Sequence, residues 1–166
     1  MSFRTERKRP KCSLTVHANR CSAGNQRDVL FSTKTEYGNV LDFALNACRL
    51  SPDWQSAWAL CDERYAEYNW IHVCPNAAAQ VVALWFGEGD FDLTLEIICG
   101  IGNDVDCNAA QILCVLALQK GSSIIAERWA KPLLSDDIVT YMRRPAKIAF
   151  DDLVGMTVDA ARRWKP

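Results

Sequence analysis

Two aspartates that lie two residues apart, Asp104 and Asp106, are well suited to bind a metal ion. They belong to segment 100–110, in which Gly100 and Gly102 permit backbone angles that other residues adopt only at a cost. A turn of this kind can direct two carboxylates at one hard cation, which prefers oxygen ligands. The same residue types also suit the first turn of a helix, where Asp and Asn accept hydrogen bonds from unpaired backbone N–H groups. The spacing alone leaves both interpretations open.

A calcium-binding EF-hand is excluded at this segment. Asp104, Asp106 and Asn108 match the first, third and fifth positions of an EF-hand loop. The sixth position requires glycine and is Ala109, and the last position requires glutamate and is Val115. The segment also continues directly into an apolar run that is typical of a helix.

Three further motifs surround this segment in a fixed order. Together the four are Pro75-Asn76-Ala77-Ala78, then Gly87-Glu88-Gly89-Asp90-Phe91, then Gly102-x-Asp104-x-Asp106-Cys107-Asn108-Ala109-Ala110, and finally Arg128-Trp129, Pro132-Leu133 and Asp136-Asp137-Ile138. This series resembles the C-terminal half of the ADP-ribosylglycohydrolase family, which includes the dinitrogenase reductase-activating glycohydrolases. The resemblance covers residues 38–165.

The resemblance implies a helical bundle and a hydrolase of ADP-ribosyl bonds that uses two Mg²⁺ ions. It implies that Asp104 and Asp106 are metal ligands and that Cys107 stands where the family often has a hydroxyl residue. A thiol is a soft ligand and suits Mg²⁺ poorly, so the amide oxygen of Asn108 is a possible substitute. The implied substrates are ADP-ribosylated proteins or small molecules that contain ADP-ribose. The candidate substrate-binding residues are Gly100, Gly102, Asn103, Asn108 and His72.

His72 precedes the Pro75-Asn76 motif and has two interpretations. A neutral imidazole could orient a metal-bound water or contact the ligand. It could equally be a structural histidine whose nitrogens are satisfied within the fold. The resemblance places the connector near the cleft and favours neither interpretation over the other.

The family's first half carries a Thr-Asp-Asp cluster and an acidic catalytic residue, and neither is found before residue 100. We therefore expect residues 38–166 to form a partial domain, from a truncated, split or degenerate gene, that supplies one side of the metal site. A missing N-terminal half is then a candidate partner, and the chain alone is expected not to hydrolyse its substrate at a useful rate. The alternative is a non-catalytic metal- or nucleotide-binding or structural module of the same fold.

The composition is that of an ordinary globular protein. The chain has 166 residues, which favours one domain, and 49% of them are hydrophobic while 23% are charged. No run of 18 apolar residues is present, so we expect no membrane span. The 8 cysteines form no Cys-x-x-Cys pair, which argues against a zinc ribbon and favours free thiols in a reducing, cytoplasmic compartment.

The charge distribution separates residues 1–37 from residues 38–166. The first segment carries eight Lys or Arg and three acids, for a net charge of +5, and the second carries eleven and seventeen, for −6. The first segment also lacks hydrophobic periodicity, so we predict a mostly disordered basic arm. Nucleic-acid binding by this arm is a weak hypothesis, because its basic run lacks interleaved aromatic residues.

Apolar periodicity predicts an all-α fold without strands. Helices are expected at 39–49, after Asp53, at 76–86, 91–99 and 109–120, in part of 122–129, and at 153–164. Asn39, Asp53 and Asp90 are expected to cap the helices that follow them. The 76–86 helix is apolar on nearly all sides and should be central, and Pro75 should keep the helix from including Cys74. Pro132 and Pro145 are expected to break the chain. The last helix is expected to bury Leu153, Met156, Val158 and Ala161.

Overall fold

The computed structural model describes residues 35–134, 137–141 and 143–164 of the chain. The chain divides after Ile124 into two units. The expectations for residues 1–34 and for Asp136 lie outside the described residues. Both units are built almost entirely from helices, which confirms the all-α prediction.

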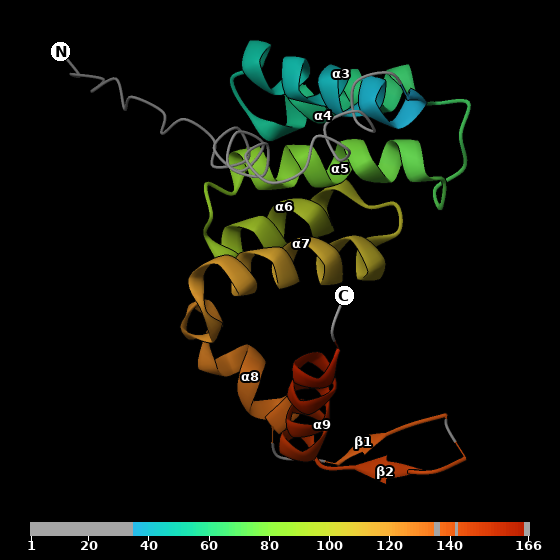
Figure 1. The fold of residues 1–166 in the computed structure, drawn as a ribbon. Coiled ribbons are helices and arrows are strands. Elements are labelled where there is room, and N and C mark those ends of the chain that lie inside the picture. The colour runs from blue at the N-terminus through green and yellow to red at the C-terminus, as the bar shows by residue number, and fades with distance from the viewer. Residues whose placement is uncertain (1–34, 135–136, 142, 165–166) are drawn as a thin grey trace, which may run out of the picture. The chain divides into compact units, whose positions relative to one another are not determined.

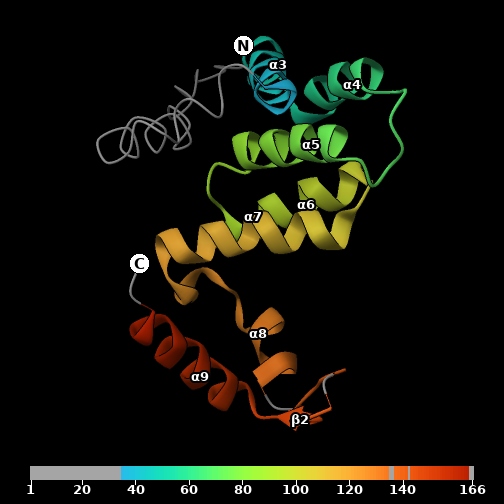
Figure 2. The ribbon, with the colours of Figure 1, turned by 45° about the vertical axis from the view of Figure 1, so that its right-hand side comes forward.

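The first unit is a stack of helices in which one helix lies between two pairs (Figures 1 and 2). Helix α5 packs against α3 and α4 on one side and against α6 and α7 on the other. The bounds are α3 Glu36–Leu50, α4 Trp54–Arg64, α5 Val73–Phe86, α6 Phe91–Ile101 and α7 Val105–Lys120, followed by the short helix η1 Ser122–Ile124.

Helix α5 is central because small and aliphatic residues cover almost its whole circumference. Ala77 and Ala78 belong to a buried cluster with α3 and α4, whereas Ala79 and Ala83 belong to a second cluster with α6 and α7. Alanine has a small side chain, so neighbouring backbones can approach α5 closely from both sides. The sequence prediction of a central helix is confirmed.

The predicted caps of the first unit are confirmed in two of three cases. Asp53 accepts a hydrogen bond from the Ser56 N–H at 2.8 Å at the start of α4, and Asp90 accepts one from Leu93 N–H at the start of α6. The prediction that Asn39 caps α3 is wrong, because the Thr35 side chain caps this helix. Threonine provides the same oxygen acceptor one turn earlier. Glu36 and Tyr37 therefore belong to the folded unit rather than to the predicted arm.

The expected start of α5 at Asn76 is also wrong, because the helix begins at Val73. Pro75 occupies the third position of α5, where the missing N–H of proline costs little because the first-turn N–H groups have no intrahelical acceptor. Cys74 N–H instead donates to His72 Nδ1 at 3.2 Å. The side-chain cap at His72 thus lets the helix include the three residues before Asn76.

The turn between α6 and α7 is shorter than the glycine-rich segment predicts. Helix α6 continues through Gly100 to Ile101, and α7 begins at Val105 rather than at Ala109. Gly102 and Asn103 have positive φ values of 86° and 61°, which reverse the chain within a few residues. Glycine adopts such values without strain, and asparagine tolerates them better than most residues do.

The second unit contains helix α8 Glu127–Leu134, strands β1 Ile138–Val139 and β2 Lys147–Ile148, and helix α9 Phe150–Arg163. The strands pair antiparallel with Ile138 opposite Ile148, so the prediction of no strands is wrong for this hairpin. Two-residue strands are too short for alternation to reveal them. The expected break at Pro132 is also wrong, because Pro132 lies inside α8.

Helix α9 confirms the predicted element but not its predicted burial. Within this fully described helix no side chain is buried, and Met156 is 58% exposed. The periodicity identifies an apolar face but does not determine whether another element covers it. Among the described residues, no helix is both long enough and apolar enough to cross a lipid bilayer.

The close packing around Gly87 yields a stability prediction for Gly87→Ala. A Cβ at Gly87 would overlap the Thr94 hydroxyl oxygen and lie 2.7 Å from the Ala83 carbonyl oxygen. Thr94 is fully buried, so it has little room to move. We expect a loss of about 1–3 kcal/mol in the free energy of unfolding, measured by urea denaturation.

The matched control is Gly155→Ala in α9, where a Cβ would meet no atom within 4 Å. This control should not destabilise the protein, because alanine favours the helix interior more than glycine does. Equal stability of wild type and Gly87→Ala would contradict the packing described here.

Candidate metal and ligand site

The two candidate metal ligands stand at the start of α7. Asp104 is the N-cap residue and Asp106 lies in the first turn. The Asp104 side chain makes no capping hydrogen bond to the helix. Its carboxylate is therefore not used as a cap, which was the alternative that the spacing left open. Both carboxylates lie at the positive end of the α7 dipole, which attracts negative charge.

Asp104, Asp106 and Cys107 form a compact group of possible ligands. One ligand atom from each lies within 4.8 Å of the other two, and Asp106 and Cys107 are exposed. Two carboxylates at this separation fit a hard divalent cation, which binds oxygen. Among the described residues, no other group of three His, Cys, Asp or Glu side chains converges in this way.

Cys107 fits such an ion poorly. Its thiol donates a hydrogen bond to the Asp104 carboxylate, and the negative charges of Asp104 and Asp106 add to this effect, so the pKa of Cys107 lies above its ordinary value. A thiol that stays protonated at neutral pH offers neither a charge nor an oxygen to Mg²⁺. The donor set that fits Mg²⁺ is therefore the carboxylate pair.

Asn76 joins the start of α7 to the start of α5. Its Oδ1 atom accepts hydrogen bonds from Asp104 N–H at 3.3 Å and from Asn108 Nδ2 at 2.6 Å. Its Nδ2 atom donates to the carbonyls of Trp70 at 2.8 Å and His72 at 2.9 Å. Asn76 is only 7% exposed, so these bonds replace water that the buried amide has lost.

Asn108 is the second member of a series of hydrogen-bonded side-chain amides, the amide chain, which consists of Asn76, Asn108, Gln80 and Gln111. It is 1% exposed, and its Oδ1 accepts a hydrogen bond from Gln80 Nε2 at 2.8 Å. Gln80 Nε2 also donates to Gln111 Oε1 at 2.8 Å. The amide oxygen of Asn108 is thus engaged inside the fold, which gives Asn108 a structural role beside the aspartates.

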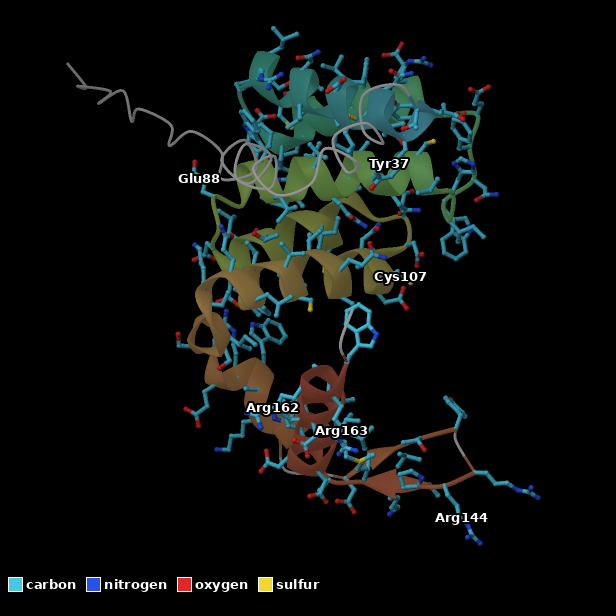
Figure 3. All side chains as sticks on the ribbon, viewed as in Figure 1. Tyr37, Glu88, Cys107, Arg144, Arg162 and Arg163 are labelled. Carbon is cyan, nitrogen blue, oxygen red and sulfur yellow. The ribbon has the colours of Figure 1, made fainter. Side chains whose placement is uncertain are left out.

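A pocket of about 210 Å³ lies next to the carboxylates, between α3, α5 and α7. Figure 3 labels Tyr37 and Cys107 on the same side of the first unit, and both line this pocket. No Lys, Arg or His of the described chain is among its lining residues. The lining residues are Tyr37, Ile71, Val73, Asn76, Ala77, Gln80, Asp104, Cys107, Asn108 and Gln111.

The remaining candidate ligand-binding residues take other positions. His72 caps α5 through Nδ1 and stacks on the Tyr68 ring with centroids 4.2 Å apart. Gly100 lets α6 approach the Trp54 ring, because a Cβ there would lie 2.9 Å from it. Neither residue lines the pocket. Gly102 and Asn103 form the turn, and the buried Nδ2 of Asn103 has no partner among the described residues.

The two glutamines and Tyr37 were not predicted from the sequence as site residues. A signal for Gln80 was present, because Asn76 and Gln80 are the two amide side chains in an otherwise apolar run and are spaced to share one helix face. Gln111 likewise follows Asn108 at a helical interval. Tyr37 carries no such signal, because only the packing of α3 on α5 brings it to the pocket.

One comparison with known proteins gives a match. A model of the ADP-ribosylglycohydrolase family matches residues 15–161. The match includes the whole first unit as described and begins within the segment that the sequence analysis assigned to a basic arm. No curated protein and no solved structure matches the chain.

The amide chain yields a prediction for Asn76→Ala and Asn108→Ala. Either change leaves buried polar atoms without partners, so each should lower the free energy of unfolding by about 1–3 kcal/mol. Because the two side chains share a hydrogen bond, the double variant should lose less than the sum of the single losses. Urea denaturation of the four proteins completes the double-mutant cycle.

The control is Asn46→Ala, which removes an exposed amide whose one described bond is to Arg49. This change should cost no more than about 0.5 kcal/mol. Strict additivity of Asn76→Ala and Asn108→Ala would contradict a shared network.

Proposed function

The chain belongs to the ADP-ribosylglycohydrolase family, and on that premise we propose that it binds the ADP-ribosyl group of its substrate at a magnesium ion held by Asp104 and Asp106. The observation that carries this proposal is the convergence of the two aspartates, with ligand atoms within 4.8 Å, at the edge of a pocket. The family implies ADP-ribosylated substrates and the use of metal ions.

The donor set supports magnesium rather than a softer metal. Two ionised carboxylates are hard ligands, and Mg²⁺ often binds through one or two carboxylates while it keeps several waters. The Cys107 thiol, which the neighbouring carboxylates keep protonated, would be the only soft atom at the site. A bound Mg²⁺ supplies polarisation of the ribosyl hydroxyls and of a water molecule.

The chain's own residues hold this arrangement in place. The Asn76 amide accepts a hydrogen bond from the backbone N–H of Asp104 and so fixes the turn from which the carboxylate projects. The positive end of the α7 dipole attracts the negative charge of the Asp106 carboxylate. The pocket walls shelter one ring-sized part of the ligand, since about 210 Å³ is smaller than the range of about 300–1,000 Å³ for drug-sized ligands.

A non-catalytic binding module is the second candidate function, and one observation favours it. Within the described residues, Asp104 is the only carboxylate that lines the pocket, and no third carboxylate joins the group with Asp106. Hydrolysis needs ligands on more than one side of the metal and a group for proton transfer. We therefore treat binding and hydrolysis as separate predictions.

The binding prediction concerns ADP-ribose in the presence of Mg²⁺. Calorimetry should detect binding that depends on Mg²⁺ and disappears with a chelator. Asp104→Asn keeps the side-chain shape but removes the charge, so it should weaken binding at least about tenfold, equivalent to about 1.4 kcal/mol.

The control is Asp42→Asn, which removes an exposed carboxylate from α3 that is not among the pocket residues. This variant should bind like wild type. ADP-ribose binding that is unchanged by Asp104→Asn, or that persists without a divalent cation, would refute the proposed site.

The hydrolysis prediction is that this chain alone releases ADP-ribose very slowly. Loss of general acid–base catalysis alone costs a factor of about 10²–10⁴. The measurement is release of ADP-ribose from ADP-ribosylated arginine and serine peptides at millimolar Mg²⁺. Rapid release of ADP-ribose that vanishes in Asp104→Ala or Asp106→Ala would contradict this prediction. It would mean that the metal ligands on this chain suffice for hydrolysis.

A further inference from the structure

The amide chain beside the carboxylates has a fixed polarity. Asn76 Nδ2 faces two backbone carbonyls, which only accept hydrogen bonds, and Asn76 Oδ1 faces the Asp104 N–H, which only donates. The orientation of this first amide is therefore determined by backbone groups. Each later amide must match the one before it, because a donor has to meet an acceptor.

This polarity passes along the chain to the two glutamines. Asn108 must present Nδ2 to Asn76 Oδ1, which leaves its Oδ1 for Gln80. Gln80 Nε2 then uses both of its hydrogens, one on Asn108 Oδ1 and one on Gln111 Oε1, each at 2.8 Å. Two atoms at the end of the chain stay open. Among the described residues, Gln80 Oε1 and Gln111 Nε2 have no hydrogen-bond partner.

Both glutamines line the pocket, so it carries one open acceptor and one open donor on two side chains that are hydrogen-bonded to each other. A hydroxyl group both donates and accepts, and a vicinal diol can therefore satisfy the two atoms together. The ionised pyrophosphate of an ADP-ribosyl group lacks a donor for Gln80 Oε1, and a guanidinium lacks an acceptor for Gln111 Nε2. The exposed faces of Tyr37, Ile71 and Val73 provide apolar walls for the C–H face of a sugar ring.

We propose that Gln80 and Gln111 are specificity-determining residues that bind the hydroxyl groups of the ribosyl ring. This inference rests on the proposed function, which brings an ADP-ribosyl group to Asp104 and Asp106. Gln80 Oε1 accepts a hydrogen bond from one of these hydroxyl groups. Gln111 Nε2 donates to the neighbouring hydroxyl. The orientation of both amides comes from Asn76 and Asn108, so these two act as positioning residues.

The test compares ADP-ribose with ADP, which has the same adenine and pyrophosphate but lacks the terminal ribose. The measured quantity is the ratio of their dissociation constants at saturating Mg²⁺. Gln80→Met removes the open acceptor, and Gln111→Glu keeps the oxygen that binds Gln80 but replaces the open donor. Each should reduce the preference for ADP-ribose by about three- to tenfold, the effect of one hydrogen bond.

The matched control is Gln119→Glu, which adds the same charge to an exposed position of α7 outside the pocket. It should keep the wild-type ratio. A second readout is the side-chain amide signal of Gln111 in a nitrogen–proton NMR spectrum. This signal should shift on addition of ADP-ribose and stay in place on addition of ADP, which a merely structural role of Gln111 does not predict.

The outcomes separate this inference from the proposed function. If Asp104→Asn weakens ADP-ribose binding but both glutamine variants keep the wild-type ratio, the metal site stands and the role of the glutamines is refuted. If Asp104→Asn has no effect while the glutamine variants lose the preference, the metal site is refuted and the role of the glutamines stands. A wild-type protein that binds ADP as tightly as ADP-ribose overturns the inference.

Discussion

The site depends on one buried side chain, Asn76. Its amide forms hydrogen bonds to three parts of the fold. These are the connector before α5, the turn before α7, and Asn108 inside α7. A buried amide with unmet hydrogen bonds would cost about 1–3 kcal/mol, so the three segments can pack only where they meet it. The position of the Asp104 backbone is a consequence of this requirement.

The alanines of α5 make that meeting possible. Ala79 and Ala83 allow α6 and α7 to pack closely on one side, and Ala77 and Ala78 do the same for α3 and α4 on the other. Larger side chains at these positions would move α7 away from Asn76 and open the hydrogen bond to Asn108. The same close packing brings Tyr37 of α3 to the pocket that α7 helps to form.

Charge and hydrogen bonding divide the pocket into two parts. One edge carries the Asp104 carboxylate, whose hydrogen bond from the Cys107 thiol raises the pKa of that thiol. The rest consists of neutral amides and apolar walls, and no basic residue of the described chain lines it. Such a pocket repels a free anion unless a cation is present at the carboxylate edge, and it accepts a neutral polar ring without that help.

The sequence by itself determined the all-α class, the central position of α5, the caps at Asp53 and Asp90, and the family. These features depend on local periodicity, on side chains that bond to their own helix, or on motifs in a fixed order. It also identified Asp104 and Asp106 as candidates, although neighbouring residues could not distinguish a cap from a ligand. Only the tertiary structure decided that Asp104 makes no capping bond, that His72 caps α5, and that the Asn108 oxygen is engaged by Gln80. Only the structure showed the hydrogen bond between Gln80 and Gln111, which are 31 positions apart. Such a bond depends on how α5 and α7 pack, and no periodic pattern in the sequence indicates it.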